Sequence, residues 1–515
     1  MKWDILFKNG TIYTMNDNNP KASWVGIQAG KIIAAGLEEP NETNAEQVID
    51  LKGQIMFPGF IDSHLHGTAT GEYLQEFNLK DAKNINEILE IVKNHCQVDG
   101  DGWIKGSGLD IRNLEDKRPP SRFELDKVSK NHPVYIKNRT MHGCLLNSKA
   151  MDLLQIPEDL QGIVINEEGE KTGELSSDDS TLYAAGKINK LTSDEEIKKY
   201  IHATAKYCVS QGCTTICCLD GNMFDKSDRD FYMWMYMAEQ LPLHITHFYQ
   251  TEDVHKVKAL GLKQIGGCLC LDGATFEGTM AAREPYNEKL YPKGILYWSD
   301  ERLYRFLKRA NEEGLQTAMH AIGDAAIDQY LRVYEKVYNE LGLEGNPNRN
   351  RIEHFSLVWP DQIKKAISMG LILSMQPIFT YTWDKKKDNV YEALMDKKRA
   401  DRMEPFAEIV INGGIIAGGS DSPVTAPSPL KGIHAAVNLE KEWKRLSVHE
   451  AIRLFTVNGA IANRQEDKKG TIEAGKLADF VVLDADPYEN ADRIQNLKVM
   501  MTVVEGKVVF EHKYD

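Results

Sequence analysis

Short apolar segments alternate with longer amphipathic segments through the middle of the chain. Residues 194–212 and 300–314 have the apolar spacing of helices, and the segments between such stretches are short, apolar and bounded by polar turns. This alternation predicts parallel β/α units. We expect strands within residues 60–66, 134–140, 214–220, 267–272, 315–321, 351–357, 371–377 and 415–421. Because that makes eight strands, the fold class predicted is α/β, with a (β/α)8 TIM-like barrel.

Both ends of the chain have a different pattern, which predicts short strands joined by tight turns. Residues 25–36 read as a hairpin that turns at Ala29-Gly30, and residues 500–511 as a hairpin that turns at Glu505-Gly506. We therefore expect one small β domain built from both termini. The predicted boundaries are 1–57 and 466–515 for the two parts of this domain and 58–465 for the barrel.

Charge and composition exclude several classes of function. A net charge of −14 argues against a general affinity for nucleic acid or anionic membranes. The first residues alternate like a strand and lack the apolar core of a signal peptide, so we expect a cytoplasmic protein. The eight cysteines include no CxxC pair, which excludes a zinc ribbon or a thioredoxin-like motif. Most of them are expected to be buried free thiols.

Side chains that can bind a metal stand at the ends of several predicted strands. His64 and His66 are two residues apart in GFIDSHLHG, so an extended strand would point both toward the same face. The other candidates at strand ends are Cys268, His320, His354 and Asp421. A lone histidine in a strand is commonly a core residue, and Asp421 could cap the turn before Pro423. The joint pattern favours a metal site, because histidine and carboxylate are ligands of zinc, manganese, iron and cobalt.

The motifs PGFIDSHLHG, HAIGD, RIEH, GGSDSPV and KKGTIEAGKLADFVVLDADP resemble the amidohydrolase superfamily, within it the YtcJ-like branch, also called amidohydrolase family 3. The matching stretches extend from about residue 50 to about residue 510. The resemblance implies a metal-bearing barrel and a small β-sandwich formed by both termini.

The resemblance also implies roles at individual positions. His64 and His66 would be the metal pair of the first strand, His320 and His354 the ligands of the fifth and sixth, and Asp421 a ligand that also handles the proton. Cys268 stands where many relatives have a lysine that bridges two metals when carboxylated. A thiolate could replace it, giving one or two divalent ions, zinc being the expected metal. Cys270 shares a strand face with Cys268, and the resemblance singles out Cys268, so Cys270 is expected to be a packed thiol.

Such a site predicts a hydrolase that cleaves an amide-type C–N bond outside ordinary peptides. A deaminase is an alternative, although many related deaminases carry a glutamate where this chain has Gly323. An esterase or lactonase, and a non-catalytic metal-binding scaffold, also remain open. We expect a small-molecule substrate, no nucleic-acid or membrane partner, and allow a homodimer. Residues that could face the substrate, although structural roles suit each equally well, are Asp110, His142, Asp324, Gln376 and Trp383.

Overall fold

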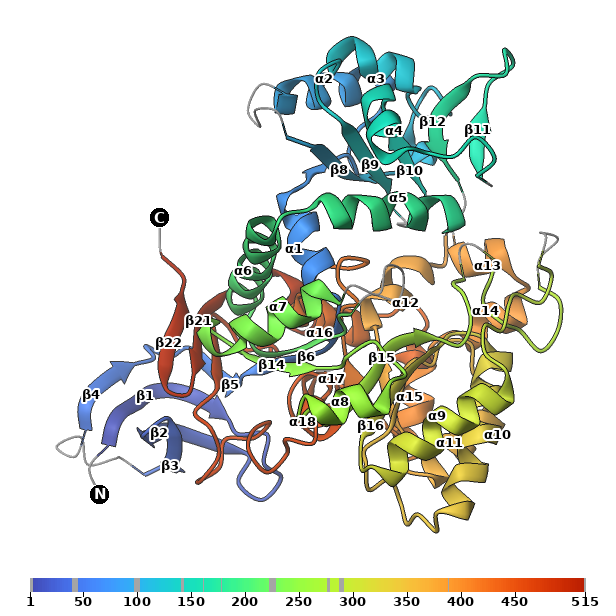
Figure 1. Ribbon diagram of the computed structural model, residues 1–515. Helices are drawn as coiled ribbons and strands as arrows, with labels where there is room; N and C mark the ends of the chain where they lie inside the picture. Colours follow the sequence, from blue (N-terminus) through green and yellow to red (C-terminus); the bar gives the residue numbers. More distant parts are fainter. Residues whose placement is uncertain are drawn as a thin grey trace. The chain divides into compact units, whose positions relative to one another are not determined.

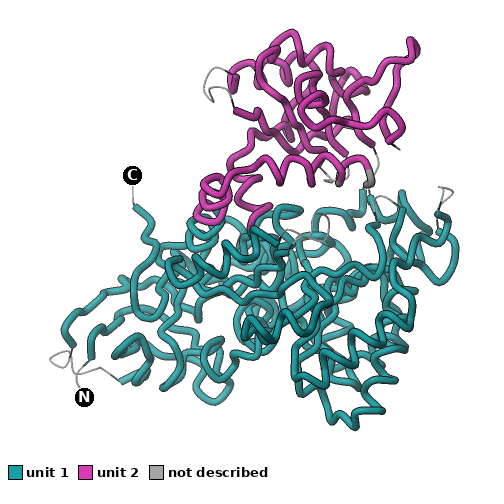
Figure 2. Tube along the Cα trace, viewed as in Figure 1, with its two compact units in different colours: residues 1–67, 204–223, 227–515 teal, residues 68–203, 224–226 magenta. Residues whose placement is uncertain are grey.

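The computed structural model describes residues 3–38, 45–96, 102–139, 143–160, 162–176, 178–221, 228–275, 278–286, 291–387 and 389–513. The chain divides into two compact units (Figure 2). Unit 1 takes residues 1–67, 204–223 and 227–515, and unit 2 takes residues 68–203 and 224–226. Each unit is described by itself below.

Strands from both ends of the chain share one sheet of unit 1. Its order is β22-β21-β20-β5-β1-β2-β3, with β4 paired to β1 (Figure 1). The hairpins predicted at Ala29-Gly30 and Glu505-Gly506 are confirmed as β2–β3 and β21–β22. The bounds are β1 Trp3–Tyr13, β2 Lys21–Gln28, β3 Lys31–Gly36, β4 Ala45–Asp50, β5 Ile55–Pro58, β20 Phe480–Leu483, β21 Val499–Val504 and β22 Lys507–Glu511.

Parallel strands form the remainder of the sheet structure in unit 1. Among the described residues they pair in the orders β14-β13-β6 and β15-β16-β17-β18-β19. Parallel bridges between Tyr249 and Ile265 and between Leu65 and Ser422 connect the two sets at both of their edges. The bounds are β6 Phe60–Leu65, β13 Cys213–Cys218, β14 His244–His247, β15 Gln264–Cys270, β16 Gln316–Ala321, β17 Arg351–His354, β18 Ile372–Met375 and β19 Ile415–Gly418.

Amphipathic helices connect these strands and bury one face each. Helix α9 (Asp300–Glu312) begins where the Ser299 side chain accepts a hydrogen bond from the Arg302 amide, and it buries Leu303, Phe306 and Leu307. Among the described residues, the largest apolar core lies mainly between these helices and the parallel strands and extends to β5 and β20. The other helices of this region are α7 Arg229–Met237, α8 Val254–Ala259, α10 Asp324–Glu340, α11 Pro360–Ser368, α12 Pro377–Trp383, α13 Val390–Leu394, α14 Lys397–Arg402, α15 Phe406–Ile411, α16 Pro429–Val437, α17 Val448–Leu454 and α18 Val457–Ala462.

Unit 2 has a mixed sheet of its own, which corrects one prediction. The strand expected within residues 134–140 exists as β9, but it pairs with β8 and β10 in the order β11-β12-β10-β9-β8-β7. Its side chains Ile136 and Tyr135 are buried in separate apolar clusters of this unit. Strand β13 instead lies between β6 and β14, and β14 is a strand that the sequence reading missed. The strands are β7 Phe77–Asn78, β8 Ile104–Leu109, β9 Val134–Asn138, β10 Cys144–Leu146, β11 Ile163–Ile165 and β12 Lys171–Leu175. The helices are α2 Ile85–Cys96, α3 Arg122–Val128, α4 Ser148–Leu154 and α5 Asp178–Leu191. Helices α1 Gly67–Gln75 and α6 Asp194–Ser210 connect the two units along the sequence.

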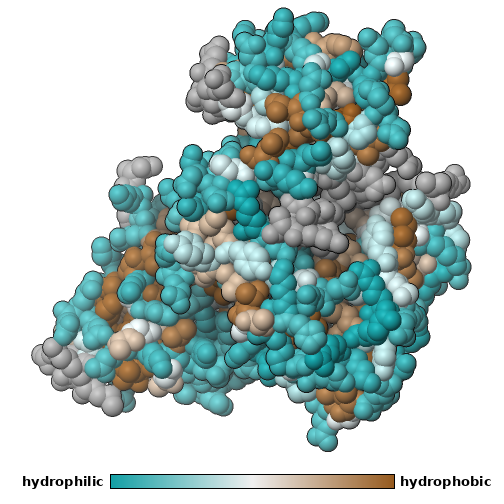
Figure 3. Space-filling view, viewed as in Figure 1, coloured by the Kyte–Doolittle hydropathy of each residue, from teal (hydrophilic) through white to brown (hydrophobic). Residues whose placement is uncertain are grey.

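The protein is an α/β protein with mixed sheets. The face drawn in Figure 3 is mostly hydrophilic and carries separate hydrophobic patches. Within the described residues, no helix combines the length and the apolar character needed to cross a membrane.

Candidate metal centre

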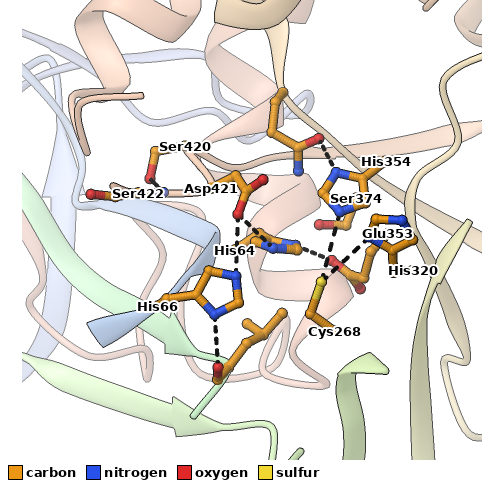
Figure 4. Close-up of polar contacts among 12 residues, drawn as sticks. His64, His66, Cys268, His320, Glu353, His354, Ser374, Ser420, Asp421 and Ser422 are labelled. Carbon is orange, nitrogen blue, oxygen red and sulfur yellow. Dashed lines mark hydrogen bonds and ion pairs between the residues drawn. The ribbon is translucent and has the colours of Figure 1, made fainter. Parts of the chain in front are cut away.

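Six side chains that can bind a metal lie together where the parallel strands of unit 1 end (Figure 4). Among the described residues their ligand atoms form three overlapping sets, one of which also includes Cys270. Strand β6 and the residue that follows it supply two of the side chains, and the others come from the ends of four more strands. The six are His64, His66, Cys268, His320, His354 and Asp421, all of which the sequence analysis had selected.

One side of the centre consists of His64, His66 and Asp421. The Asp421 Oδ1 atom is 3.2 Å from His64 Nε2 and 3.3 Å from His66 Nε2. The Asp421 backbone amide donates to the His64 carbonyl at 2.7 Å, which fixes the end of β19 against β6. One carboxylate oxygen therefore faces two imidazole nitrogens at nearly equal distances.

Cys268 occupies the other side of the centre, between two further histidines. Its Sγ atom is 3.7 Å from His320 Nδ1 and 3.8 Å from His354 Nε2. Cys268 is only 7% exposed and also contacts an apolar cluster that includes Leu219 and Phe248. The thiol therefore has one apolar side and one side directed at the imidazoles.

These separations fit ligands of a divalent ion. Tetrahedral zinc with Zn–N and Zn–O distances near 2.0 Å and Zn–S near 2.3 Å holds nitrogen and oxygen ~3.3 Å apart and nitrogen and sulfur ~3.6 Å apart. The measured N···O distances of 3.2 and 3.3 Å and S···N distances of 3.7 and 3.8 Å are close to these values. His64 Nε2 is buried and makes no well-aligned hydrogen bond among the described residues, although Asp421 Oδ1 lies 3.2 Å away, and a cation bound there would satisfy both atoms.

Each histidine of the centre uses one ring nitrogen for an outer contact and directs the other nitrogen inward. His64 Nδ1 lies 2.6 Å from Glu353 Oε2, His66 Nδ1 donates to the Leu219 carbonyl at 3.1 Å, and His354 Nδ1 donates to Gln376 Oε1 at 3.0 Å. His320 Nε2 donates to the Gly273 carbonyl at 3.4 Å. Outer contacts of this kind select the tautomer and the ring orientation that a metal ligand needs.

The contact to His64 is supported by a buried ion pair. Arg351 Nη2 donates to Glu353 Oε2 at 2.8 Å and to the Ser63 carbonyl at 2.6 Å, and the side chains of Arg351, Glu353 and His64 are fully buried. Burial raises the pKa of Glu353, but Arg351 and His64 lower it by more, to about 2. Glu353 is therefore a carboxylate that accepts from both neighbours.

Electrostatics keep Asp421 and His354 in their ligating forms, whereas at His64 and His320 burial lowers the pKa but neighbouring acidic groups raise it by more, to about 9. Burial raises the pKa of Asp421, but His64 and His66 lower it by more, so that it stays well below its ordinary value. Burial and the neighbouring His320 lower the pKa of His354 to about 3, which leaves that imidazole neutral. A carboxylate and a neutral imidazole are the states in which these residues bind metals.

Two residues of the centre have an unusual backbone conformation. His354 has φ of 73° and Asp421 has φ of 52°, in the left-handed region that non-glycine residues rarely adopt. Such strain persists where the surrounding structure determines the position, and it is concentrated at functional sites.

The residues proposed for substrate contact have diverse positions. Gln376 contacts the candidate ligand His354, as described above. Asp324 at the start of α10 accepts from the Arg283 amide and from Trp359 Nε1, which are structural contacts. Trp383 packs on Phe379 with ring centroids 4.6 Å apart. Asp110 belongs to unit 2, where its carboxylate is 3.7 Å from Arg139, and His142 lies outside the described residues.

Sequence reasoning missed the buried pair of Arg351 and Glu353. A signal was present, because RIEH places two opposite charges inside a four-residue strand that is buried throughout. Charged side chains in such a strand need partners, and their spacing of two puts both on one face.

A family model described as amidohydrolase family matches residues 47–510. The chain belongs to the amidohydrolase family. This amidohydrolase is 27% identical to YtcJ of Bacillus subtilis, a protein named as an amidohydrolase, over 98% of this chain and 99% of that protein. It is 23% identical to the N-substituted formamide deformylase of Arthrobacter pascens, over 99% of this chain and 98% of that protein.

Solved structures agree with the family assignment. A crystal structure of an uncharacterized metal-dependent hydrolase from Pyrococcus horikoshii matches with a TM-score of 0.79 and 27% identity, covering 94% of this amidohydrolase and 98% of that chain. Membership of this family makes the protein a metal-dependent hydrolase that uses a divalent metal and acts on a small molecule.

Proposed function

We propose that the protein hydrolyses an amide-type C–N bond, other than a peptide bond, in a small molecule. The observation that carries this proposal is the convergence of four imidazoles, one thiol and one carboxylate at the ends of parallel strands. The similarity to an N-substituted formamide deformylase supports the choice of an amide bond.

The fold that we propose for this centre is a (β/α)8 barrel with a β-sandwich made by both termini. The bridges between Tyr249 and Ile265 and between Leu65 and Ser422 support closure of the parallel strands into a ring. Active sites of such barrels lie at the carboxyl ends of the strands, which is where the candidate ligands are.

Zinc is the metal we propose, with one or two ions per chain. His64, His66 and Asp421 would hold one position, and Cys268 with His320 and His354 would hold the adjacent one. When bound, a divalent ion of this type lowers the pKa of water to ~7 and polarises a carbonyl oxygen. A cytoplasmic location, which we also propose, would keep the Cys268 thiol reduced.

Asp421 is the proposed acid–base residue. Its Oδ1 atom faces the two imidazoles, and its side chain is 11% exposed. A carboxylate there can take a proton from water and deliver it to the leaving amine. Glu353 and Gln376 act as positioning residues, because they orient His64 and His354.

The structure offers no room for the glutamate of many related deaminases. A Cβ atom at Gly323 would lie 2.0 Å from the Ala281 carbonyl oxygen, so a side chain at this position requires a shift of the backbone. This observation favours hydrolysis of an acyclic amide over deamination of a heterocycle.

The test is hydrolysis of a panel of N-formyl and N-acyl amines, carboxylic esters and heterocyclic amines by metal-loaded and chelator-treated protein. We expect turnover of amides, its loss with the metal, and its recovery with zinc. Asp421→Asn should retain part of the metal and lower turnover by ~10²-fold or more. Asp467→Asn, at an exposed position, is the control. Undiminished turnover by metal-free protein, or by Asp421→Asn, would refute the proposal.

A further inference from the structure

We propose that Cys270 is a metal ligand together with Cys268 and His320, so that the centre contains a sulfur-rich position for a soft divalent ion. The inference rests on the metal requirement of the proposed function and extends the ligand set beyond the six residues named above.

The strand pairing places Cys270 beside a candidate ligand. In the parallel ladder of β15 and β16, Cys270 is directly paired with His320. Cys268 precedes Cys270 by two residues, and both side chains therefore project from the same side of β15. The His64-x-His66 pair at the end of β6 has the same spacing. Two strands of one centre thus each contribute an i, i+2 pair of donor side chains.

An irregularity in β15 sets the direction of the two thiols. The register of β15 against β16 shifts between Ile265 and Leu269, and Gly266 and Gly267 have φ of 98° and 61°. A Cβ atom at Gly266 would lie 2.3 Å from the Ala318 carbonyl oxygen, so the close approach requires glycine. The bulge directly precedes Cys268, and it therefore decides which face of the strand both cysteines occupy.

The three donor atoms are close enough to share an ion. One ligand atom each of Cys268, Cys270 and His320 lies within 4.8 Å of the other two. Two ligand atoms of one tetrahedral zinc are ~3.6 Å apart for nitrogen and sulfur and ~3.8 Å apart for two sulfurs. Side-chain rotations that move the donor atoms of this set by ~1 Å therefore bring them to bonding distance.

The surroundings of Cys270 differ from those of a packed thiol. Cys268 belongs to an apolar cluster with Cys217, Leu219, Phe248 and Ala318, whereas no apolar cluster of the described residues includes Cys270. Cys270 is also partly exposed, as a thiol that reaches into the open side of the centre would be.

Two thiolates and one imidazole form a donor set for soft and borderline ions. Zinc, cobalt(II) and cadmium suit such a set, whereas manganese and magnesium prefer oxygen ligands. The position at Cys268, Cys270 and His320 would therefore bind the former ions selectively, and the His64, His66 and Asp421 position would tolerate a wider range.

The test is spectroscopic and uses the full chain. Metal-free protein is loaded with cadmium, and the thiolate-to-cadmium charge-transfer absorbance in the ultraviolet is measured for the parent, Cys268→Ser, Cys270→Ser and the double variant. We expect each single substitution to remove about half of the charge-transfer absorbance per cadmium ion bound at this position. The double substitution should remove nearly all of it. Cys96→Ser, at another partly exposed cysteine, should keep the full absorbance.

A second measurement needs no substitution and remains decisive if a variant fails to fold. Parent protein is treated with iodoacetamide with and without cadmium, and modification of each cysteine is followed by mass spectrometry. Cadmium should protect Cys270 and leave the rate at Cys96 unchanged. Full absorbance in folded Cys270→Ser, or equal modification of Cys270 with and without cadmium, would overturn the inference. Metal-dependent turnover would persist in that case, whereas turnover by metal-free protein would refute the proposed function itself.

Discussion

Replacing Glu353 with glutamine should damage both the stability of the protein and its affinity for metal. In the structure one carboxylate accepts from His64 Nδ1 at 2.6 Å and from Arg351 Nη2 at 2.8 Å, with all three side chains fully buried. Glutamine has nearly the same shape, but it has no charge and a single acceptor oxygen. Glu353 Oε1 also accepts from Arg351 Nε. The amide nitrogen of glutamine would face either this donor or both His64 Nδ1 and Arg351 Nη2, so at least one contact is lost. In either orientation the negative charge opposite His64 Nδ1 is lost as well.

The expected magnitudes follow from this geometry. Breaking a buried ion pair by removing one partner costs about 3–5 kcal/mol, because the Arg351 guanidinium stays buried without its counter-charge. Loss of an outer contact to a ligating histidine costs about 10–100-fold in metal affinity. The first effect lowers the unfolding free energy and the second lowers the affinity for zinc, and Glu353→Gln should show both.

The two effects are measured separately. Urea unfolding of metal-free protein gives the change in unfolding free energy, and competition with a chromophoric chelator gives the change in zinc affinity. Ser374→Ala is the matched control, because it removes a neutral hydroxyl that is 3.1 Å from Arg351 Nη2 and keeps the ion pair. It should cost about 1–2 kcal/mol and leave zinc affinity nearly unchanged. If Glu353→Gln binds zinc as tightly as the parent, Glu353 does not position His64.

Two further predictions concern the backbone of β15 and the pH dependence of stability. Gly266→Ala should lower the unfolding free energy by about 2 kcal/mol or more beyond the effect of Gly261→Ala. Both glycines have positive φ, but a Cβ atom at Gly261 meets no atom within 4 Å. Equal melting temperatures of the two variants would contradict this prediction. Burial raises the pKa of Glu404 from 4.5 to about 7, so the folded state binds the extra proton between these pH values. The contribution of Glu404 to the unfolding free energy should therefore fall by about 3 kcal/mol as pH rises from 4.5 to 7. Glu404→Gln is neutral throughout and should make the decline shallower in urea unfolding at pH 5 and pH 8; an unchanged difference between the two pH values would count against the raised pKa.

The parallel strands of the centre were predictable because each is a short apolar run that ends in a polar or glycine-containing turn. Pairing was less predictable, because it depends on residues far apart in sequence. Val134–Asn138 has the apolar character of a barrel strand, but its partners β8 and β10 lie in another unit. His244–His247 is only four residues long and contains two histidines, so periodicity alone could not identify it as a strand.

The candidate ligands were predictable to the extent that each stands at the end of a strand. The spacing in His64-x-His66 indicates a shared face, and the structure places both imidazoles against Asp421. Residues that act through another residue were harder to find. Glu353 precedes His354 in the sequence but contacts His64, which is 289 positions away. Strand β17 pairs with β16 and β18, while β6 pairs with β13, so strand order along the sheets does not reveal this contact. The bulge at Gly266 and Gly267, which directs Cys270, likewise depends on contacts with the neighbouring strand.

The sheet shared by both chain ends has a consequence for synthesis on the ribosome. Strand β5 at Ile55–Pro58 pairs with β1 on one edge and with β20 at Phe480–Leu483 on the other. At about 5–20 residues per second, β20 emerges roughly 20–80 s after β5. During this interval β5 has an open edge whose backbone groups can pair with any nearby strand. This edge of β5 therefore stays unpaired in the native sense until β20 has been translated.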